Sequence, residues 1–273
     1  MELDDLRTGF GAVAGAPSRG KAGRPPIGRD ISAEVANSVL RSGGRRVAEL
    51  ASEIGVSEVT IRRSLDALER RGILKRFHGE ARPYDGDAIP FRMGLHVEAK
   101  RRIAELAESL VREGDTILLE AGSAVAYFAE RLRSKRGLSV ITPNLFIARI
   151  FRGSGVRVVV VGGAYQEESE SLVGSMAVEA IAGAGFSKAF IGVSGFTVEA
   201  GFTLNDFARA EISRSILARG AENWVLTDSS KFGQTHAASI AEDLSGIRGI
   251  VTDAGLPGDC RLALEASRVD IRQ

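Results

Sequence analysis

The stretch VSEVTIRRSLDALERRGILKRFHG, residues 56–79, decides how the first part of the chain folds. Ile61, Leu65 and Leu68 recur at intervals of four and three residues, which predicts a helix with one narrow apolar face. The stretch also holds six Arg and Lys residues against three Asp and Glu residues. An ordinary solvated helix face would explain this charge, and so would a surface that binds phosphates and base edges. The flanking residues distinguish the two.

Two further helices are predicted upstream of this stretch. Residues 31–41 and 46–54 both repeat apolar side chains at helical spacing. We expect Gly55 to end the second helix, Ser57 to cap the third and Gly72 to end it. ILKRF, residues 73–77, is typical of a strand, and HGEAR after it of a turn. This order of elements predicts a winged helix-turn-helix over residues 29–82, which favours DNA binding over a solvated face.

Within this predicted domain, six residues are candidates for contacting double-stranded operator DNA. The hydroxyls at the start of the third helix suit phosphates, the arginines after them suit guanine edges or phosphates, and the basic residues of the wing suit the minor groove. The candidates are Ser57, Thr60, Arg62, Arg63, Arg76 and His78. Charge agrees weakly, because residues 1–82 hold 15 basic against 11 acidic residues (+4) and residues 83–273 hold 21 against 24 (−3).

The segments on either side of this domain carry no predicted fold. Residues 1–28 are rich in Gly, Ala, Pro and Arg, which predicts a disordered basic tail. The tail contains GAPSRGKA, a near match to a phosphate-binding loop, but Ala22 replaces the hydroxyl that would hold magnesium and no apolar strand precedes it. Residues 83–97 contain Pro83, Gly86, Pro90 and Gly94 and are predicted to be a linker.

Residues 98–273 alternate helical segments with short apolar strands. The predicted strands lie in DTILLEAGS, LSVITP, VRVVVVGG, KAFIGVSG, NWVLTDSS, RGIVTDAG and VDI. Continuous apolar strands separated by helices predict a mainly parallel sheet with helices on both faces. The fold class is therefore α/β, with a small winged helix-turn-helix domain in front of a larger sheet domain.

Small and polar residues follow five of these strands. In an open parallel sheet, ligands bind beyond the carboxyl ends of the strands, so these residues are expected to converge. Amides at the start of the helix predicted for residues 123–132 suit an anion, a lysine adds positive charge, and carboxylate or amide groups suit sugar hydroxyls. The candidate ligand-binding residues are Glu120, Gly122, Ser123, Asn144, Gly162, Gly163, Ser194, Asp228, Ser230 and Lys231.

The chain resembles the DeoR family of bacterial transcription regulators. The resemblance is carried by residues 46–82, by FRMGLHVEAKRRIAELAESLVREGDTILLEAGSAV, and by the motifs TPN, VVGG, IGVSG, TDSSKFG and IVTDAG. It covers roughly residues 30–270. It implies a repressor of sugar or carbon catabolism genes, with a C-terminal domain that resembles ribose-5-phosphate isomerase and senses a phosphorylated sugar or related intermediate. Such modules read DNA as dimers, so a homo-oligomer is expected.

Three positions depart from the family pattern. The family usually has an acidic residue at position 64, a glycine at position 80 and an aspartate at position 120, where this chain has Ser64, Glu80 and Glu120. We expect Ser64 to remove a negative charge beside the DNA and Glu80 to add one to the wing. The longer Glu120 is expected to alter the size or hydroxyl selectivity of the pocket.

Two other classes of function stay open on the sequence alone. An isomerase or acyl-transfer enzyme on the same fold would need a placed base, but GVSGFTV has no acid before Glu199, and the hydrolase motif G-x-S-x-G is absent. A DNA-binding scaffold with a purely structural second domain is the third interpretation. No catalytic residue, metal or cofactor is predicted. One cysteine, no long apolar run and no signal-like start predict a cytoplasmic protein without a membrane partner.

Overall fold

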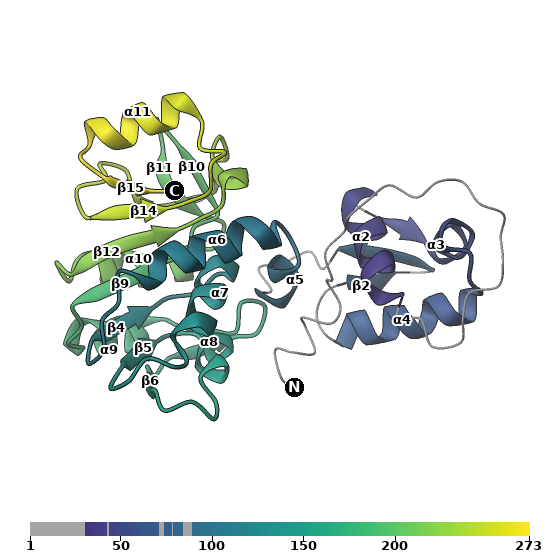
Figure 1. Cartoon of the computed structure of the whole chain (residues 1–273), viewed down its shortest axis with the longest axis horizontal. Coiled ribbons are helices and arrows are strands. Elements are labelled where there is room, and N and C mark those ends of the chain that lie inside the picture. The colour runs from purple at the N-terminus through teal and green to yellow at the C-terminus, as the bar shows by residue number, and fades with distance from the viewer. Residues whose placement is uncertain (1–30, 43, 71–73, 78, 84–88) are drawn as a thin grey trace. The chain divides into compact units, whose positions relative to one another are not determined.

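The computed structural model describes residues 31–42, 44–70, 74–77, 79–83 and 89–273 (Figure 1). The chain forms two compact units, Met1–Gly94 and Leu95–Gln273. The division falls inside the predicted linker. The predicted tail, residues 1–28, lies outside the described residues, as does the phosphate-loop-like sequence within it.

The first unit is a winged helix-turn-helix. Its helices are α2 (Ser32–Ser42), α3 (Val47–Ile54) and α4 (Glu58–Arg70), followed by a short α5 (Ile89–Met93). Strands β1 (Arg45–Arg46), β2 (Leu74–Phe77) and β3 (Glu80–Pro83) form an antiparallel sheet in the order β1-β3-β2. The three helices and the sheet enclose one core, in which Leu50, Ile61 and Leu65 are fully buried. The predicted apolar face of the third helix is therefore confirmed.

The local signals that separate α3 from α4 act as the sequence predicts. Gly55 takes a left-handed conformation (φ 75°) at the end of α3, which a residue without a Cβ adopts at little cost. The Ser57 hydroxyl accepts a hydrogen bond from the Thr60 amide at 3.2 Å, which caps α4. Strands β1 and β3 were not predicted. β1 has two residues, and the segment that forms β3 was interpreted as a turn.

The second unit is built on a seven-stranded sheet in which every pairing is parallel. The strand order is β15-β14-β12-β9-β4-β5-β6. The strands are β4 (Thr116–Leu119), β5 (Ser139–Thr142), β6 (Arg157–Val160), β9 (Lys188–Ile191), β12 (Glu222–Leu226), β14 (Gly249–Val251) and β15 (Asp270–Arg272). Each overlaps a segment predicted to be a strand, so the parallel α/β prediction is confirmed.

Helices cover both faces of this sheet (Figure 1). They are α6 (Val97–Glu108), α7 (Ser123–Leu132), α8 (Leu145–Ile150), α9 (Ser175–Gly183), α10 (Phe207–Leu217) and α11 (Gly258–Ala266). On one face, Leu118 and Ala189 belong to a core that includes Ile181 of α9 and Ile216 of α10. On the other face, the Phe128 ring of α7 packs 4.6 Å from the Phe190 ring of β9, centroid to centroid.

Two smaller β structures were not predicted. Strands β7 (Ala164–Gln166) and β8 (Ser171–Val173) form an antiparallel hairpin, and β10 (Gly195–Thr197), β11 (Gly201–Leu204) and β13 (Ala238–Ala241) form a separate antiparallel sheet. A 3-10 turn, Ser229–Lys231, follows β12. No helix within the described residues has the length and apolar character needed to cross a membrane.

Candidate functional site

The amino-terminal half of α4 presents the predicted DNA-binding side chains to solvent. Ser57, Thr60, Arg62 and Arg63 are all exposed. The Ser57 and Thr60 hydroxyls are 2.9 Å apart, and the Arg62 guanidinium bonds the Glu58 carboxylate at 2.8 Å. An exposed pair of this kind contributes at most about 1 kcal/mol, so Arg62 can exchange its partner for a phosphate.

Ser64 is buried, whereas the sequence predicted it to lie beside the DNA. Its hydroxyl donates to the Ser32 hydroxyl of α2 at 3.1 Å. The expectation that it removes a negative charge from the DNA-facing side was wrong, because position 64 lies between Ile61 and Leu65 on the face that packs inward.

The wing is tied to α4 by Arg76. Its guanidinium bonds the Asp66 carboxylate at 2.7 Å and the Glu69 carboxylate at 3.0 Å, and its amide also donates to Glu69. Two acidic side chains of α4 therefore already bind this arginine, and its contact with DNA stays a prediction. His78, the other predicted wing contact, lies outside the described residues.

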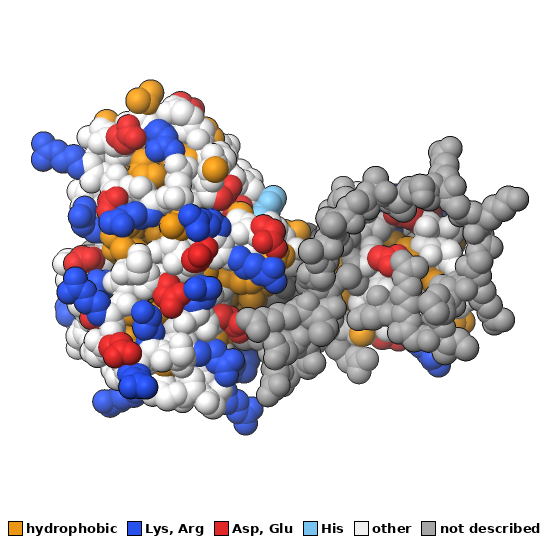
Figure 2. Space-filling view, viewed as in Figure 1, with side chains coloured by type: hydrophobic (Ala, Val, Ile, Leu, Met, Phe, Trp, Pro, Cys, Tyr) orange, Lys and Arg blue, Asp and Glu red, His pale blue; other side chains and the backbone are white. Residues whose placement is uncertain are grey.

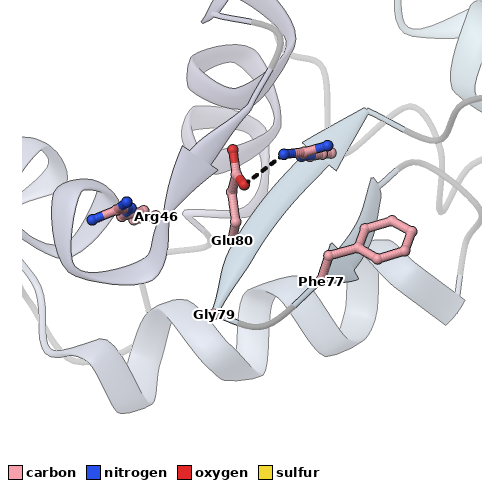
Figure 3. A pocket seen from close by; sticks show the side chains of 5 residues that line it. Arg46, Phe77, Gly79 and Glu80 are labelled. Atoms are coloured by element: carbon pink, nitrogen blue, oxygen red, sulfur yellow. Dashed lines mark hydrogen bonds and ion pairs between the residues drawn. The ribbon is translucent and has the colours of Figure 1, made fainter.

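A hollow of about 440 Å³ lies at the wing. Arg46, Phe77, Gly79, Glu80 and Arg82 line it, and Figure 3 shows Arg46 and Phe77 on either side of Glu80. The Glu80 carboxylate bonds the Arg82 guanidinium at 3.0 Å. Glu80 thus adds a negative charge to the wing, as expected, and this charge is paired with that of Arg82.

In the second unit, the carboxyl ends of all seven strands lie at the same edge of the sheet because every pairing is parallel. From β4 the chain adds β5 and β6 on one side and then returns to add β9 on the other. The strand order therefore reverses between β4 and β9, which is where an open α/β sheet forms its ligand crevice.

Two glycines let the ends of β4 and β9 approach each other at this point. A Cβ on Gly192 would lie 2.2 Å from the Ala121 carbonyl oxygen, and a Cβ on Gly122 would lie 3.3 Å from the Gly192 Cα. Gly122 also has a φ of 130°, a conformation that disfavours residues with side chains. The predicted residues Glu120, Gly122 and Ser123 are thereby held against the end of β9.

A buried ion pair lies at the same point. The Arg209 guanidinium of α10 is 3.6 Å from the Glu120 carboxylate, and both side chains are about 2% exposed. The second oxygen of Glu120 accepts from the Gly192 amide at 3.3 Å. The longer side chain that distinguishes Glu120 from the family's aspartate is engaged with both neighbours.

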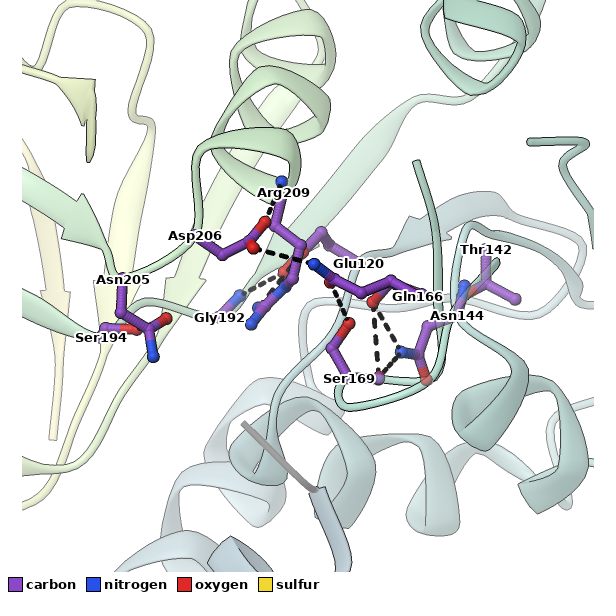
Figure 4. Close-up of polar contacts among 11 residues, drawn as sticks. Glu120, Thr142, Asn144, Gln166, Ser169, Gly192, Ser194, Asn205, Asp206 and Arg209 are labelled. Carbon is purple, nitrogen blue, oxygen red and sulfur yellow. Dashed lines mark hydrogen bonds and ion pairs between the residues drawn. The ribbon is translucent and has the colours of Figure 1, made fainter. Parts of the chain in front are cut away.

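Hydrogen bonds extend from this pair to the β7–β8 hairpin (Figure 4). Asp206 caps α10 by accepting from the Arg209 amide at 2.7 Å, and its other oxygen accepts from the Gln166 side chain at 2.8 Å. Ser169 in the same hairpin bonds Gln166 through its hydroxyl and accepts from the Asn144 amide group through its carbonyl. The hairpin is thus fastened to α10 and to the end of β5.

The helices that start at this edge differ in how their first amides are satisfied. Asn144 caps α8 by accepting from the Ile147 amide at 3.0 Å, and Asp206 caps α10. The N-cap of α7 is Gly122, which has no side chain to bond the first amides of the helix. Ser123 and Ala124 at this end are buried. The start of α7 can therefore receive an anion more readily than the other two helices.

The end of β12 adds further charged groups. Asp228 is buried, accepts from the Ser230 amide at 3.2 Å and lies 3.9 Å from the ammonium group of Lys100. Lys100 is itself buried on α6 and donates to the Leu95 carbonyl at 2.7 Å. Lys231 is half-buried in the 3-10 turn that follows. Because β12 neighbours β9, these groups lie beside the switch point.

The remaining predicted residues lie at the same edge in structural positions. The Ser194 hydroxyl bonds the Asn205 side chain at 3.2 Å, and the Asn144 side chain bonds Ser169, Ser171 and Ile147. A Cβ on Gly163 would lie 2.9 Å from the Val173 carbonyl oxygen, so this glycine allows β8 to approach. Gly162 is exposed. A role for these residues in ligand binding stays a prediction.

Four residues at this edge were not predicted from the sequence: Lys100, Gln166, Asp206 and Arg209. Asp206 had a usable signal, since an aspartate before a helical pattern predicts an N-cap. Arg209 and Lys100 had none, because a basic residue in an amphipathic helix is normally exposed. Only the tertiary structure shows that both are buried.

The described residues and the face of the second unit drawn in Figure 2 were compared with two other kinds of site, a metal centre and a surface of one charge sign. Within the described part of the chain, no group of three His, Cys, Asp or Glu side chains is placed to hold a metal ion. Basic and acidic side chains are interspersed over the face of the second unit that Figure 2 shows.

Comparison with known proteins assigns both units. Residues 32–85 match the DeoR-like helix-turn-helix domain, and residues 95–254 match the DeoR C-terminal sensor domain. The chain belongs to the DeoR family of transcriptional regulators. Among DeoR-family relatives, the lactose phosphotransferase system repressor of Streptococcus mutans is 32% identical over 81% of this chain and 90% of its own. The putative aga operon transcriptional repressor of Escherichia coli O157:H7 is 26% identical over 87% of this chain and 91% of its own.

Solved structures resemble the DeoR-family chain more distantly. Ribose 5-phosphate isomerase A of Neisseria gonorrhoeae aligns with a TM-score of 0.34 and 16% identity over 49% of this chain and 52% of its own. At this TM-score the similarity supports no conclusion about the activity of this chain.

Proposed function

We propose that this protein represses genes of sugar or carbon catabolism by binding an operator through α4 and the wing. The exposed amino-terminal half of α4 carries the proposal, because it presents two hydroxyls and two guanidinium groups from one end of a helix. That combination suits phosphates and guanine edges in a major groove. The relatives named as a lactose phosphotransferase system repressor and a putative aga operon transcriptional repressor support it.

Operator binding by parent and variant proteins tests the first half of the proposal. The DNA probes are genomic fragments of the source organism that the parent protein selects by binding. Arg63→Ala should weaken specific binding by about 1–3 kcal/mol if the side chain reads a base, with a loss of sequence discrimination. Arg101→Ala serves as the control for the loss of an exposed arginine outside α4. Arg101 lies on α6 and pairs with Glu98, as Arg62 pairs with Glu58 on α4. If an Arg62→Ala, Arg63→Ala double variant stays folded and binds as tightly as the parent, α4 is not the recognition helix.

We further propose that a phosphorylated sugar or related intermediate binds at the carboxyl edge of the sheet and controls DNA affinity. The amides at the start of α7, after β4, supply donors for a phosphate. Lys231 supplies positive charge from the turn after β12, and one strand, β9, lies between β12 and β4. Asp228 lies at the same edge and suits sugar hydroxyls, which accept and donate. The ion pair between Glu120 and Arg209 fixes the end of β4 beside them.

A thermal-shift screen with phosphorylated and unphosphorylated sugars tests the second half. A ligand that binds only the folded protein raises its apparent stability in proportion to the logarithm of its concentration. We expect a shift with one or a few sugar phosphates and a much smaller shift with the same sugars lacking phosphate. A parent protein that responds to no phosphorylated compound, in stability or in operator binding, would remove the sensor proposal. A sensor releases operator DNA when the sugar phosphate binds and leaves the sugar phosphate unchanged, whereas an isomerase converts it.

Two copies of the chain are expected on each operator, since helix-turn-helix proteins read paired half-sites related by a twofold axis. The half-site spacing will then reflect the distance between the two α4 helices.

A further inference from the structure

The two edge strands of the seven-stranded sheet differ in how they are protected. β15 carries Asp270 and Arg272, whose side chains bond each other at 3.0 Å. β6, at the other edge, carries three consecutive valines after Arg157. Edge strands in monomeric proteins usually carry charges, prolines or bulges that prevent pairing with another strand. β15 follows this rule and the valines of β6 do not.

The β6 valines are exposed on both faces of the strand. Val159 is 41% exposed and Val160 is 40% exposed, and they point to opposite faces because successive side chains alternate. Met176 and Tyr165 are also exposed, and the Met176 methyl group lies 3.9 Å from where a Cβ on Gly162 would be. Apolar surface therefore continues past the carboxyl end of β6.

The backbone of β6 is arranged for a second partner. The Arg157 amide donates to the Leu138 carbonyl, and the Val161 amide donates to the Thr142 carbonyl, so odd-numbered residues bond β5. Because successive backbone groups point to opposite sides of a strand, the N–H and C=O groups of Val158 and Val160 point to the open edge. Among the described residues, β5 is the strand that pairs with β6.

We propose that β6 pairs with β6 of a second copy of this chain, antiparallel about a twofold axis, so that two seven-stranded sheets join into one. The open backbone groups dictate the register. Val158 of each copy exchanges two hydrogen bonds with Val160 of the other, and the two Val159 residues face each other on the axis as a non-hydrogen-bonded pair. Each pair across the central interface joins valine to valine, which β-branched side chains favour.

Charge favours a second copy over another occupant. Exposed Arg152 and Arg157 lie at the amino end of β6, whereas exposed Glu167 and Glu168 lie in the hairpin beyond its carboxyl end. Partial burial and then the nearby Glu170 and Glu167 carboxylates raise the pKa of the Tyr165 hydroxyl, and the nearby Arg149 lowers it less. Antiparallel pairing brings the basic end of each copy toward the acidic end of the other. The surface is therefore complementary to itself.

The need for two copies rests on the proposed operator binding, but the pairing of β6 can be measured without DNA. Sedimentation of the full chain gives its mass in solution. Val159→Lys places two ammonium groups opposite each other on the axis and should halve the sedimenting mass. Val198→Lys is the matched control, because Val198 is 49% exposed in the turn between β10 and β11, and it should leave the mass unchanged.

The twofold axis makes a sharper requirement. Val159→Glu alone should also halve the mass, whereas an equimolar mixture of Val159→Lys and Val159→Glu chains should restore it, since residue 159 meets its own copy. Only a contact of residue 159 with itself gives this result. A parent that sediments as a monomer, a Val159→Lys chain with the parent's mass, or a mixture that stays dissociated would each overturn the proposal. The last outcome would instead indicate a different protein or another part of the chain on β6.

A cysteine variant keeps the test decisive if the charged variants do not fold. Facing residues of a non-hydrogen-bonded antiparallel pair have Cα atoms about 4.5 Å apart, within the range that a disulfide spans. Val159→Cys should therefore crosslink to a covalent dimer under mild oxidation, whereas Val198→Cys should not. The native Cys260 is buried and does not interfere. Absence of the Val159→Cys crosslink in a folded protein overturns the proposal. An oligomer joined through β6 that binds no operator would support the β6 pairing and contradict the proposed function.

Discussion

At the scale of single residues, Gly192 determines how closely β4 and β9 meet at the switch point. Any side chain there would begin 2.2 Å from the Ala121 carbonyl oxygen, a distance that no relaxed Cβ occupies. The Gly192 amide also donates to Glu120, which faces Arg209. A small change at this position therefore separates two strand ends and disturbs a buried ion pair.

We predict that Gly192→Ala lowers the free energy of unfolding by about 1–3 kcal/mol, as overpacking of a filled interior does. Gly155→Ala is the control, because no heavy atom lies within 4 Å of its added Cβ, and the change there should stay within about 0.5 kcal/mol. Urea denaturation of both variants measures the difference. Equal stabilities would mean that the β4 and β9 ends separate without cost.

At the scale of elements, the wing depends on Arg76. Its ion pairs with Asp66 and Glu69 fix β2 against α4, although all three side chains are roughly one-third to one-half exposed. The sequence predicted that Arg76 contacts DNA, and the structure shows which carboxylates already bind it. The two roles differ in their dependence on salt.

We predict that Arg76→Ala weakens operator binding while leaving the slope of log affinity against log salt unchanged, because the residue positions the wing. A phosphate contact would lower the slope by about 0.9. Binding titrations at several salt concentrations, with Arg62→Ala as a comparison, measure this slope. A decrease of that size for Arg76→Ala would establish the DNA contact and contradict the positioning role.

A second element-scale device joins β4 and β9 at the opposite edge of the sheet. The Lys188 ammonium bonds the Asp115 carboxylate at 3.0 Å, and the Arg112 amide bonds the same carboxylate at 2.9 Å. Burial, the largest influence, raises the pKa of Asp115, but these partners lower it more, so the net pKa lies below its ordinary value. The pair clamps the strands that flank the switch point.

This lowered pKa predicts a pH dependence of stability. The contribution of Asp115 is present above its unfolded pKa of about 3.9 and is lost as pH falls through the lower folded pKa. Asp115→Asn should therefore be less stable than the parent at neutral pH, and the difference should shrink below pH ~4. Glu179→Gln, at an exposed carboxylate on α9, is the control for the change in net charge. A difference that is constant from pH 7 to pH 3 would contradict the assignment.

At the scale of the whole molecule, the proposed effector control requires a coupling free energy between effector binding to the second unit and operator binding to the first. If effector lowers operator affinity by a given factor, operator must lower effector affinity by the same factor. The seven-stranded sheet suits this task because the proposed effector contacts come from α7 and from the turn after β12, on different strand ends.

We predict that Lys231→Ala binds operator normally without effector but responds only at a much higher ligand concentration. Its loss removes positive charge from the proposed phosphate site without touching α4. Operator complexes of parent and variant, titrated with the best ligand from the thermal-shift screen, give the two response curves. Superimposable curves would exclude Lys231 from the site.

Local patterns by themselves determined most of the architecture. Helical spacing, Gly55 and Ser57 were sufficient for α3 and α4, and continuous apolar runs were sufficient for the seven parallel strands, because these signals act over one or two turns or along one strand. The carboxyl-edge location of the candidate site followed as well, since parallel strands all end on one side. Both ends of α7 were predicted correctly, because the helical pattern of residues 123–132 is also a local signal.

Only the tertiary structure decided which side chains are buried and which strand ends touch. The local sequence predicts that Arg209, Lys100 and Ser64 are exposed on their helices. In the structure all three are buried, and Ser64 bonds Ser32 of α2. The two-residue β1 forms because the distant β3 supplies its hydrogen bonds, and the β7–β8 hairpin is held in its place by Asp206 at the start of α10. Such contacts join residues far apart in the chain, so no local spacing encodes them. The order of strands, which leaves the valines of β6 at an open edge, is decided in the same way.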